Sequence, residues 1–76
     1  MNENKKDQWE IILEHLKSGR SITSMEAINE YGFTRLSAII HTLRNSGYNI
    51  DTTMIPVKTR YGKQTMVAKY TLIKEN

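Results

Sequence analysis

The chain has 76 residues and a formal net charge of +3, with 38% hydrophobic and 25% charged residues, so we expect residues 1–76 to form one small water-soluble domain. It contains no cysteine, which excludes disulfide bonds and thiolate metal sites. No apolar run approaches the roughly 18 residues that a membrane span needs, and residues 1–8 lack the apolar core of a signal peptide. We therefore expect a cytoplasmic protein that does not associate with a membrane.

The first predicted element is a helix from about Lys5 to Ser18. Its apolar residues recur at helical spacing and form one stripe that should face the core, namely Trp9, Ile12, Leu13 and Leu16. Gly19 follows, and glycine readily adopts the left-handed conformation that closes a helix. We therefore assign Trp9 to packing and not to ligand binding.

A second helix is predicted from Thr23, because Thr23 and Glu26 have the spacing of a capping box, in which each side chain bonds the backbone amide of the other residue. Gly32 should end it. Its expected apolar face consists of Met25, Ile28 and Tyr31, with Ala27 beside them. A helix this short is stable only when it packs on its neighbours. Immediately before it, Ser21-Ile22 is predicted to add a short strand.

The third helix is predicted to start at Thr34 as its N-cap and to end at Asn45 or Ser46. Its expected core stripe consists of Leu36, Ile39, Ile40 and Leu43. Only residues 31–33 separate it from the second helix. Helices joined by such a short glycine-containing turn cross steeply, as in a helix-turn-helix.

After Gly47 the apolar pattern changes to alternation, which predicts strands at residues 48–58 and 64–73 joined by the glycine-containing loop 59–63. Pro56 has no backbone N–H, so its strand should be an edge strand or carry a bulge. The set predicted to face the core is Met66, Ala68, Tyr70 and Leu72. The expected fold class is α+β, a winged helix-turn-helix in which three helices pack with a C-terminal β-hairpin wing.

Charge is unevenly distributed along the chain. Residues 1–33 carry four basic and six acidic side chains, a net charge of −2, whereas residues 34–63 carry five basic side chains and one acidic side chain, a net charge of +4. A basic second half that follows an acidic first half is typical of a protein with one face for polyanions.

Three stretches resemble a family of small winged helix-turn-helix proteins common in bacteriophage and prophage genomes: residues 12–19 with 21–27, residues 32–40 with 43–44 and 47–50, and residues 60–63 with 68–70. The most specific parts are Thr34-Arg35-Leu36 at the start of the third helix and Leu43-Arg44 with Gly47-Tyr48 at its end. The resemblance implies a winged-helix fold and DNA binding as a transcriptional regulator or a recombination-accessory factor. Such a protein acts at the nucleoid or in the host cytoplasm.

The outward face of the third helix is the first predicted DNA contact. With Leu36, Ile40 and Leu43 directed inward, 100° per residue places these residues outward: Thr34, Ser37, Ala38, His41, Thr42 and Asn45. Short polar side chains let a helix approach base edges in the major groove. Arg35 and Arg44 should lie on opposite flanks and hold phosphates, so loss of either is expected to weaken DNA binding without lowering the melting temperature.

The predicted wing, residues 58–64, is the second contact. Lys58, Arg60 and Lys63 surround its glycine turn, and Tyr61 lies at the tip. Such a loop can lie along the DNA backbone or enter the minor groove, where basic side chains meet a strong negative potential.

The sequence offers little for catalysis. His15 and His41 lie on different predicted helices and have no cysteine to complete a metal site. We expect no enzymatic activity, no cofactor, no metal and no small-molecule substrate. The predicted partner is double-stranded DNA, and a homodimer would lengthen the DNA site that is read. The alternative is a winged-helix protein–protein interaction module without DNA binding, which the low net charge favours.

Overall fold

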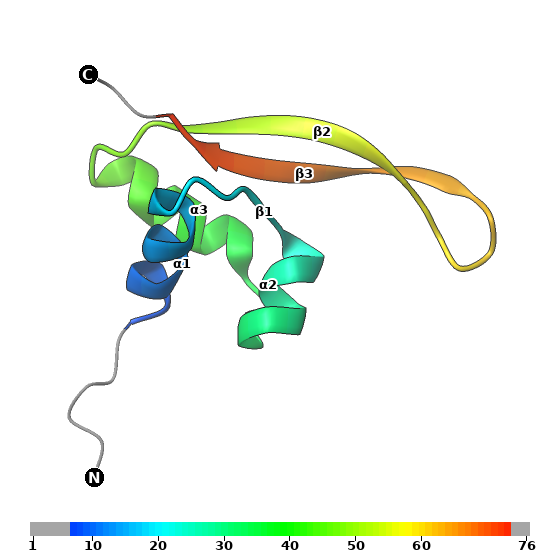
Figure 1. Cartoon of the computed structure of the whole chain (residues 1–76), viewed down its shortest axis with the longest axis horizontal. Helices are drawn as coiled ribbons and strands as arrows, with labels where there is room; N and C mark the ends of the chain where they lie inside the picture. Colours follow the sequence, from blue (N-terminus) through cyan, green and yellow to red (C-terminus); the bar gives the residue numbers. More distant parts are fainter. Residues whose placement is uncertain (1–6, 74–76) are drawn as a thin grey trace, which may run out of the picture.

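The computed structural model describes residues 7–73, in which three helices lie together on one side of a hairpin that extends beyond them (Figure 1). In chain order the elements are α1 (Gln8–Lys17), β1 (Ile22–Thr23), α2 (Ser24–Tyr31), α3 (Leu36–Asn45), β2 (Ile50–Lys58) and β3 (Gln64–Leu72). The predicted order of elements is confirmed, including the short strand before α2.

The sheet is antiparallel, with strand order β1-β3-β2. The short β1 pairs only with Lys69 and Tyr70 of β3, whereas β2 pairs with β3 along its whole length. Pro56 lies on the edge strand β2, opposite Met66, and the one-to-one register continues through it without a bulge. An edge strand tolerates a residue without a backbone N–H.

The hydrophobic core lies between α1, α3 and the part of the sheet nearest the helices. Its buried residues are Ile12, Leu13, Leu16, Ile22, Ala27, Leu36, Ile39, Ile40, Leu43 and Ile50. The stripe predicted for α3 is fully confirmed, since all four of its residues are buried. From α2 only Ala27 is fully buried, so this helix covers the edge of the core.

Several residues predicted to be core are exposed. Trp9 is 38% exposed, Met25 63%, Ile28 41% and Met66 53%. The residues on α2 project beyond the small area that this helix covers. Met66 lies in the first third of β3, residues 64–66, all of which are exposed, so the apolar alternation continues there without burial.

The three helices begin at different kinds of N-cap. The described part of α1 begins after Asp7, whose backbone N–H donates to Glu10 Oε1 at 3.0 Å. The predicted start at Lys5 lies outside the described residues. The N-cap of α3 is Arg35 and not Thr34, and no side chain caps that helix. The capping box predicted for α2 is present, with Thr23 N donating to Glu26 Oε1 at 2.9 Å and Glu26 N to Thr23 Oγ1 at 3.3 Å.

A buried histidine joins α1 to α2. His15 is 5% exposed, and its Nε2 lies 3.0 Å from the backbone carbonyl oxygen of Ser21. Because that oxygen can only accept, Nε2 carries the proton, and Nδ1 accepts a hydrogen bond from the Tyr31 hydroxyl at 2.7 Å. Each ring nitrogen therefore has a hydrogen-bond partner in the tautomer that carries its proton on Nε2.

Replacing Tyr31 with phenylalanine is expected to lower the free energy of unfolding by about 1–3 kcal/mol, because it leaves the buried Nδ1 of His15 without a partner. The ring contacts of Tyr31 with His15 and Phe33 remain in the variant. Chemical denaturation measures the loss. The control is Tyr48→Phe, since the Tyr48 hydroxyl has no hydrogen bond to a described residue, and equal losses in both variants would contradict this account.

Candidate nucleic-acid interface

The exposed side of α3 carries the short polar residues predicted from helical periodicity. The residues Ser37, Ala38, His41, Thr42 and Asn45 are all exposed, and Thr34 is exposed just before the helix. They lie on the side of α3 opposite the buried stripe. One face of the helix therefore packs in the core, and the other face is available to a ligand.

Two hydrogen bonds organise this face. The Thr42 hydroxyl donates to the Ala38 carbonyl oxygen at 3.1 Å, which leaves the lone pairs of its oxygen able to accept a hydrogen bond. Asn45 Nδ2 lies 3.2 Å from His41 Nε2, one helical turn away. Asn45 retains its carbonyl oxygen and one N–H, a donor and an acceptor that can bond a base edge.

The two arginines that flank α3 differ in their surroundings. Arg35 is exposed, and its guanidinium has no hydrogen bond or ion pair with a described residue. Arg44 instead reaches β2, where Nε and Nη2 donate to the Ile50 carbonyl oxygen at 3.1 and 2.7 Å, and Nη2 also donates to Thr52 Oγ1 at 2.7 Å. Its guanidinium carbon lies 6.0 Å from the centroid of the Tyr70 ring. Arg44 therefore ties the helix to the sheet.

This geometry corrects the expectation that Arg44 is dispensable for stability. We expect Arg44→Ala to lower the free energy of unfolding by about 1–2 kcal/mol, because charged hydrogen bonds to β2 are lost. Arg35→Ala should leave stability within about 0.5 kcal/mol of wild type. Thermal or chemical unfolding of the two variants tests this, and equal melting temperatures would contradict the assignment of Arg44.

The loop between β2 and β3 is a tight glycine turn. The N–H of Thr59 donates to the Lys63 carbonyl oxygen at 2.7 Å, and that of Gly62 donates to the Thr59 carbonyl oxygen at 3.0 Å. Gly62 has φ +82°, a left-handed conformation that L side chains rarely adopt. The turn places Arg60 and Tyr61 at the far end of the hairpin, and Tyr61 is 88% exposed.

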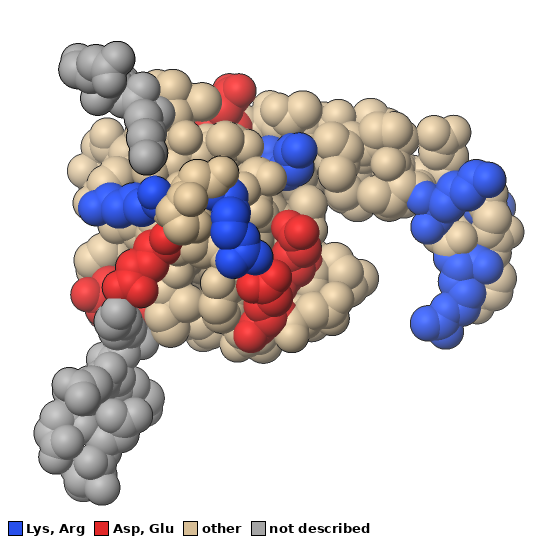
Figure 2. Space-filling model, in the orientation of Figure 1, with Lys and Arg blue, Asp and Glu red and all other residues tan. Residues whose placement is uncertain are grey.

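Basic side chains gather at this tip. Lys58, Arg60 and Lys63 are exposed, and none has a hydrogen bond or ion pair made by its side chain to a described residue. Figure 2 shows basic side chains at the hairpin tip with no acidic side chain among them, whereas the same face of the helical body carries both signs. Elsewhere Arg20 pairs with Glu30 at 3.2 Å, and Lys17 lies 5.7 Å from the Tyr48 ring centroid.

The tip and α3 form two separate groups in the fold. Eight residue steps of β2 separate Ile50, next to α3, from Lys58, a distance of roughly 26 Å at about 3.3 Å per residue. This is less than one turn of duplex DNA, about 34–36 Å.

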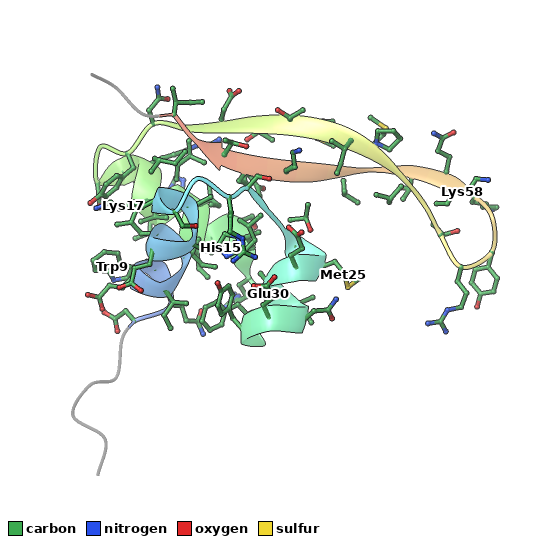
Figure 3. The ribbon with its side chains drawn as sticks, in the orientation of Figure 1. Trp9, His15, Lys17, Met25, Glu30 and Lys58 are labelled. Carbon is green, nitrogen blue, oxygen red and sulfur yellow. The ribbon has the colours of Figure 1, made fainter. Side chains whose placement is uncertain are left out.

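Trp9 lies closer to this face than the sequence indicated. It lines an open hollow of 260 Å³ together with Gln8, Arg35, Ala38 and Thr42. Its Nε1 donates to Asp7 Oδ2 at 3.2 Å (Figure 3). Helical periodicity could not reveal this placement, because it depends on how α1 crosses α3.

The side chains and helices of residues 7–73 bear on metal binding and on membrane insertion. No group of three or more His, Cys, Asp or Glu side chains in that part could hold a metal ion. None of the helices there is both long enough and apolar enough to cross a membrane.

A protein family described as "Winged helix-turn-helix domain" matches residues 7–75 of the chain, which include all the residues that the structure describes. No curated protein and no solved structure shows a significant match to the sequence. The family match covers both groups of exposed residues, those on α3 and those on the hairpin loop.

Proposed function

This chain belongs to the winged helix-turn-helix domain family, and from that premise we propose that it binds double-stranded DNA with α3 in the major groove. The observation that carries the proposal is a set of exposed cations whose side chains have no partner among the described residues, namely Arg35, Lys58, Arg60 and Lys63. Unpaired cations cost little to bring to phosphates, because no ion pair within the protein must be broken first.

The proposal divides the contacts into two kinds. Residues at the start of α3 and on its outward face read bases: Thr34, Ser37, Ala38, His41 and Asn45. Arg35 and the wing, residues 58–64, hold the backbone or enter the adjacent minor groove. Arg44 can contact phosphates only through those guanidinium N–H groups that do not donate to β2. Tyr61 contributes an exposed ring at the wing tip.

The biological role proposed is that of a cytoplasmic transcriptional regulator or recombination-accessory factor of phage or prophage type. The sequence resemblance supports this role. One such domain covers few base pairs, so we propose that a homodimer reads two half-sites.

Selection of bound duplexes from a random pool tests the proposed function. The expected result is an enriched motif, with two half-sites in the footprint when two copies bind. If no sequence motif is enriched over the starting pool and the protein retains no duplex at low salt, DNA binding is overturned. That result would favour the protein–protein interaction module.

Trp9 offers a direct spectroscopic check, because it is the only tryptophan of the chain and lies beside the exposed face of α3. Addition of duplex DNA is expected to change the fluorescence emission of Trp9. This change should saturate at the stoichiometry found by footprinting. The matched measurement uses the Arg35→Ala variant, in which the same change in Trp9 emission should require more DNA than in wild type. Emission that stays constant while DNA is bound would place the duplex away from α3.

A further inference from the structure

A second hollow has no residue of α3 in its lining. It measures 520 Å³ and is formed between α2 and the hairpin, with Met25 and Ile28 on one wall and Ile55, Val57 and Val67 on the other. Figure 3 shows Met25 directed from α2 toward the space under the hairpin, whose distal part carries Lys58. We call these five apolar residues the α2–hairpin groove.

The groove is exposed although its walls are apolar. Met25 is 63% exposed, Ile28 41% and Val57 36%, and none of the three belongs to the core. Burying such side chains against a partner releases roughly 25 cal/mol per Å² of apolar surface. Duplex DNA offers no matching surface, because its outer face is charged phosphate. The proposed DNA contacts therefore leave this groove without a role.

The rims of the groove carry opposite charges. Glu26 lies on the α2 side and Lys58 on the hairpin side. One oxygen of Glu26 accepts the Thr23 N–H, which leaves the other oxygen for an outside partner. When a second copy is rotated by 180°, the hairpin side of its groove lies over α2 of the first copy. The α2 side of its groove then lies over the hairpin of the first copy. Glu26 of each copy then faces Lys58 of the other, as a two-fold interface requires. In the dimer Lys58 therefore pairs with Glu26, and Arg60 and Lys63 of the wing remain for phosphates.

The adjacent edge of β3 is also open. Because β1 pairs only with Lys69 and Tyr70, residues 64–68 of β3 have a strand partner on one side alone within the described part of the chain. An unpaired edge readily accepts a strand from another chain. On the opposite edge of the hairpin, Pro56 lacks the N–H that such pairing needs. The edge next to the groove is therefore the better docking edge.

We propose that the α2–hairpin groove is the interface with a second copy of this chain, related by a two-fold axis. The proposal rests on the homodimer of the proposed function and not on the DNA contacts themselves. Self-complementary charge, apolar walls and an open strand edge coincide at one place. An unrelated protein would have to supply each of these features separately, whereas a second copy supplies all of them.

Sedimentation equilibrium without DNA tests the proposal on the full chain. Wild type is expected to dimerise as its concentration rises, and Met25→Glu and Val57→Glu, from opposite walls, should each raise the dimer dissociation constant about tenfold or more. The control is Met54→Glu, because Met54 is 52% exposed on the same hairpin and does not line the groove. This variant should dimerise as wild type does.

Three results would overturn the interface: a wild type that stays monomeric at every concentration, groove variants that dimerise normally, or a Met54→Glu variant that is weakened as much as they are. DNA retention is measured separately at low salt. Retention of a monomeric wild type would leave the proposed DNA binding intact, whereas a dimer that retains no duplex would contradict that function and keep the interface.

Discussion

Leu43→Ala is expected to lower the free energy of unfolding by about 2–5 kcal/mol, the range for removing a large buried aliphatic side chain. Leu43 is 0% exposed at the C-terminal end of the core stripe of α3. Small domains are stable by only about 5–15 kcal/mol in total, so this single change removes a large fraction of the stability. Chemical denaturation measures the loss.

The matched control is Ser37→Ala on the same helix, because Ser37 is exposed and should change stability by no more than about 0.5 kcal/mol. The pair tests which side of α3 faces the core, and hence which side is offered to DNA. A loss below about 1 kcal/mol for Leu43→Ala would mean that the orientation of α3 assigned above is wrong.

The double variant Arg60→Ala/Lys63→Ala is expected to flatten the dependence of log affinity on log salt by up to about two units. Each cation that neutralises a phosphate contributes about −0.9 to that slope. Both side chains are exposed at the hairpin tip and have no partner in the described residues, so they can meet the backbone. Titration of one duplex at several salt concentrations measures the change.

The control for this variant is Lys17→Ala/Arg20→Ala, which removes the same charge from the helical body. Arg20 is paired with Glu30, and Lys17 lies over the Tyr48 ring. If the wing makes direct contact, the control changes the slope much less than the wing variant. An unchanged slope in the wing variant means that the wing does not touch DNA, and equal flattening in both means that only net charge matters.

The sequence predicted the elements of the fold well because each depends on local patterns. The stripe of α3 follows from helical periodicity, and the capping box at Thr23 and Glu26 marks the start of α2. The change to alternation after Gly47, with the glycine turn at Gly62, defines the hairpin. These signals need no knowledge of what packs against what.

The surroundings of single side chains could not be predicted in the same way. Arg44 is held by a carbonyl and a hydroxyl of β2, which only the crossing of α3 and the sheet brings within reach. Trp9 and Met25 have core-like spacing, yet the small area of the helix contacts leaves both exposed. Apolar spacing indicates which way a residue points, and tertiary packing decides whether anything covers it.

The most direct test of the central claim is the affinity of the wild-type protein for one long duplex across a range of salt concentrations. If Arg35, Arg60 and Lys63 all meet phosphates, log affinity should fall linearly with log salt with a slope of about −2.7 for each bound copy. Affinity that does not fall as salt rises, or no binding even at low salt, would contradict the claim that these cations form a surface for double-stranded DNA.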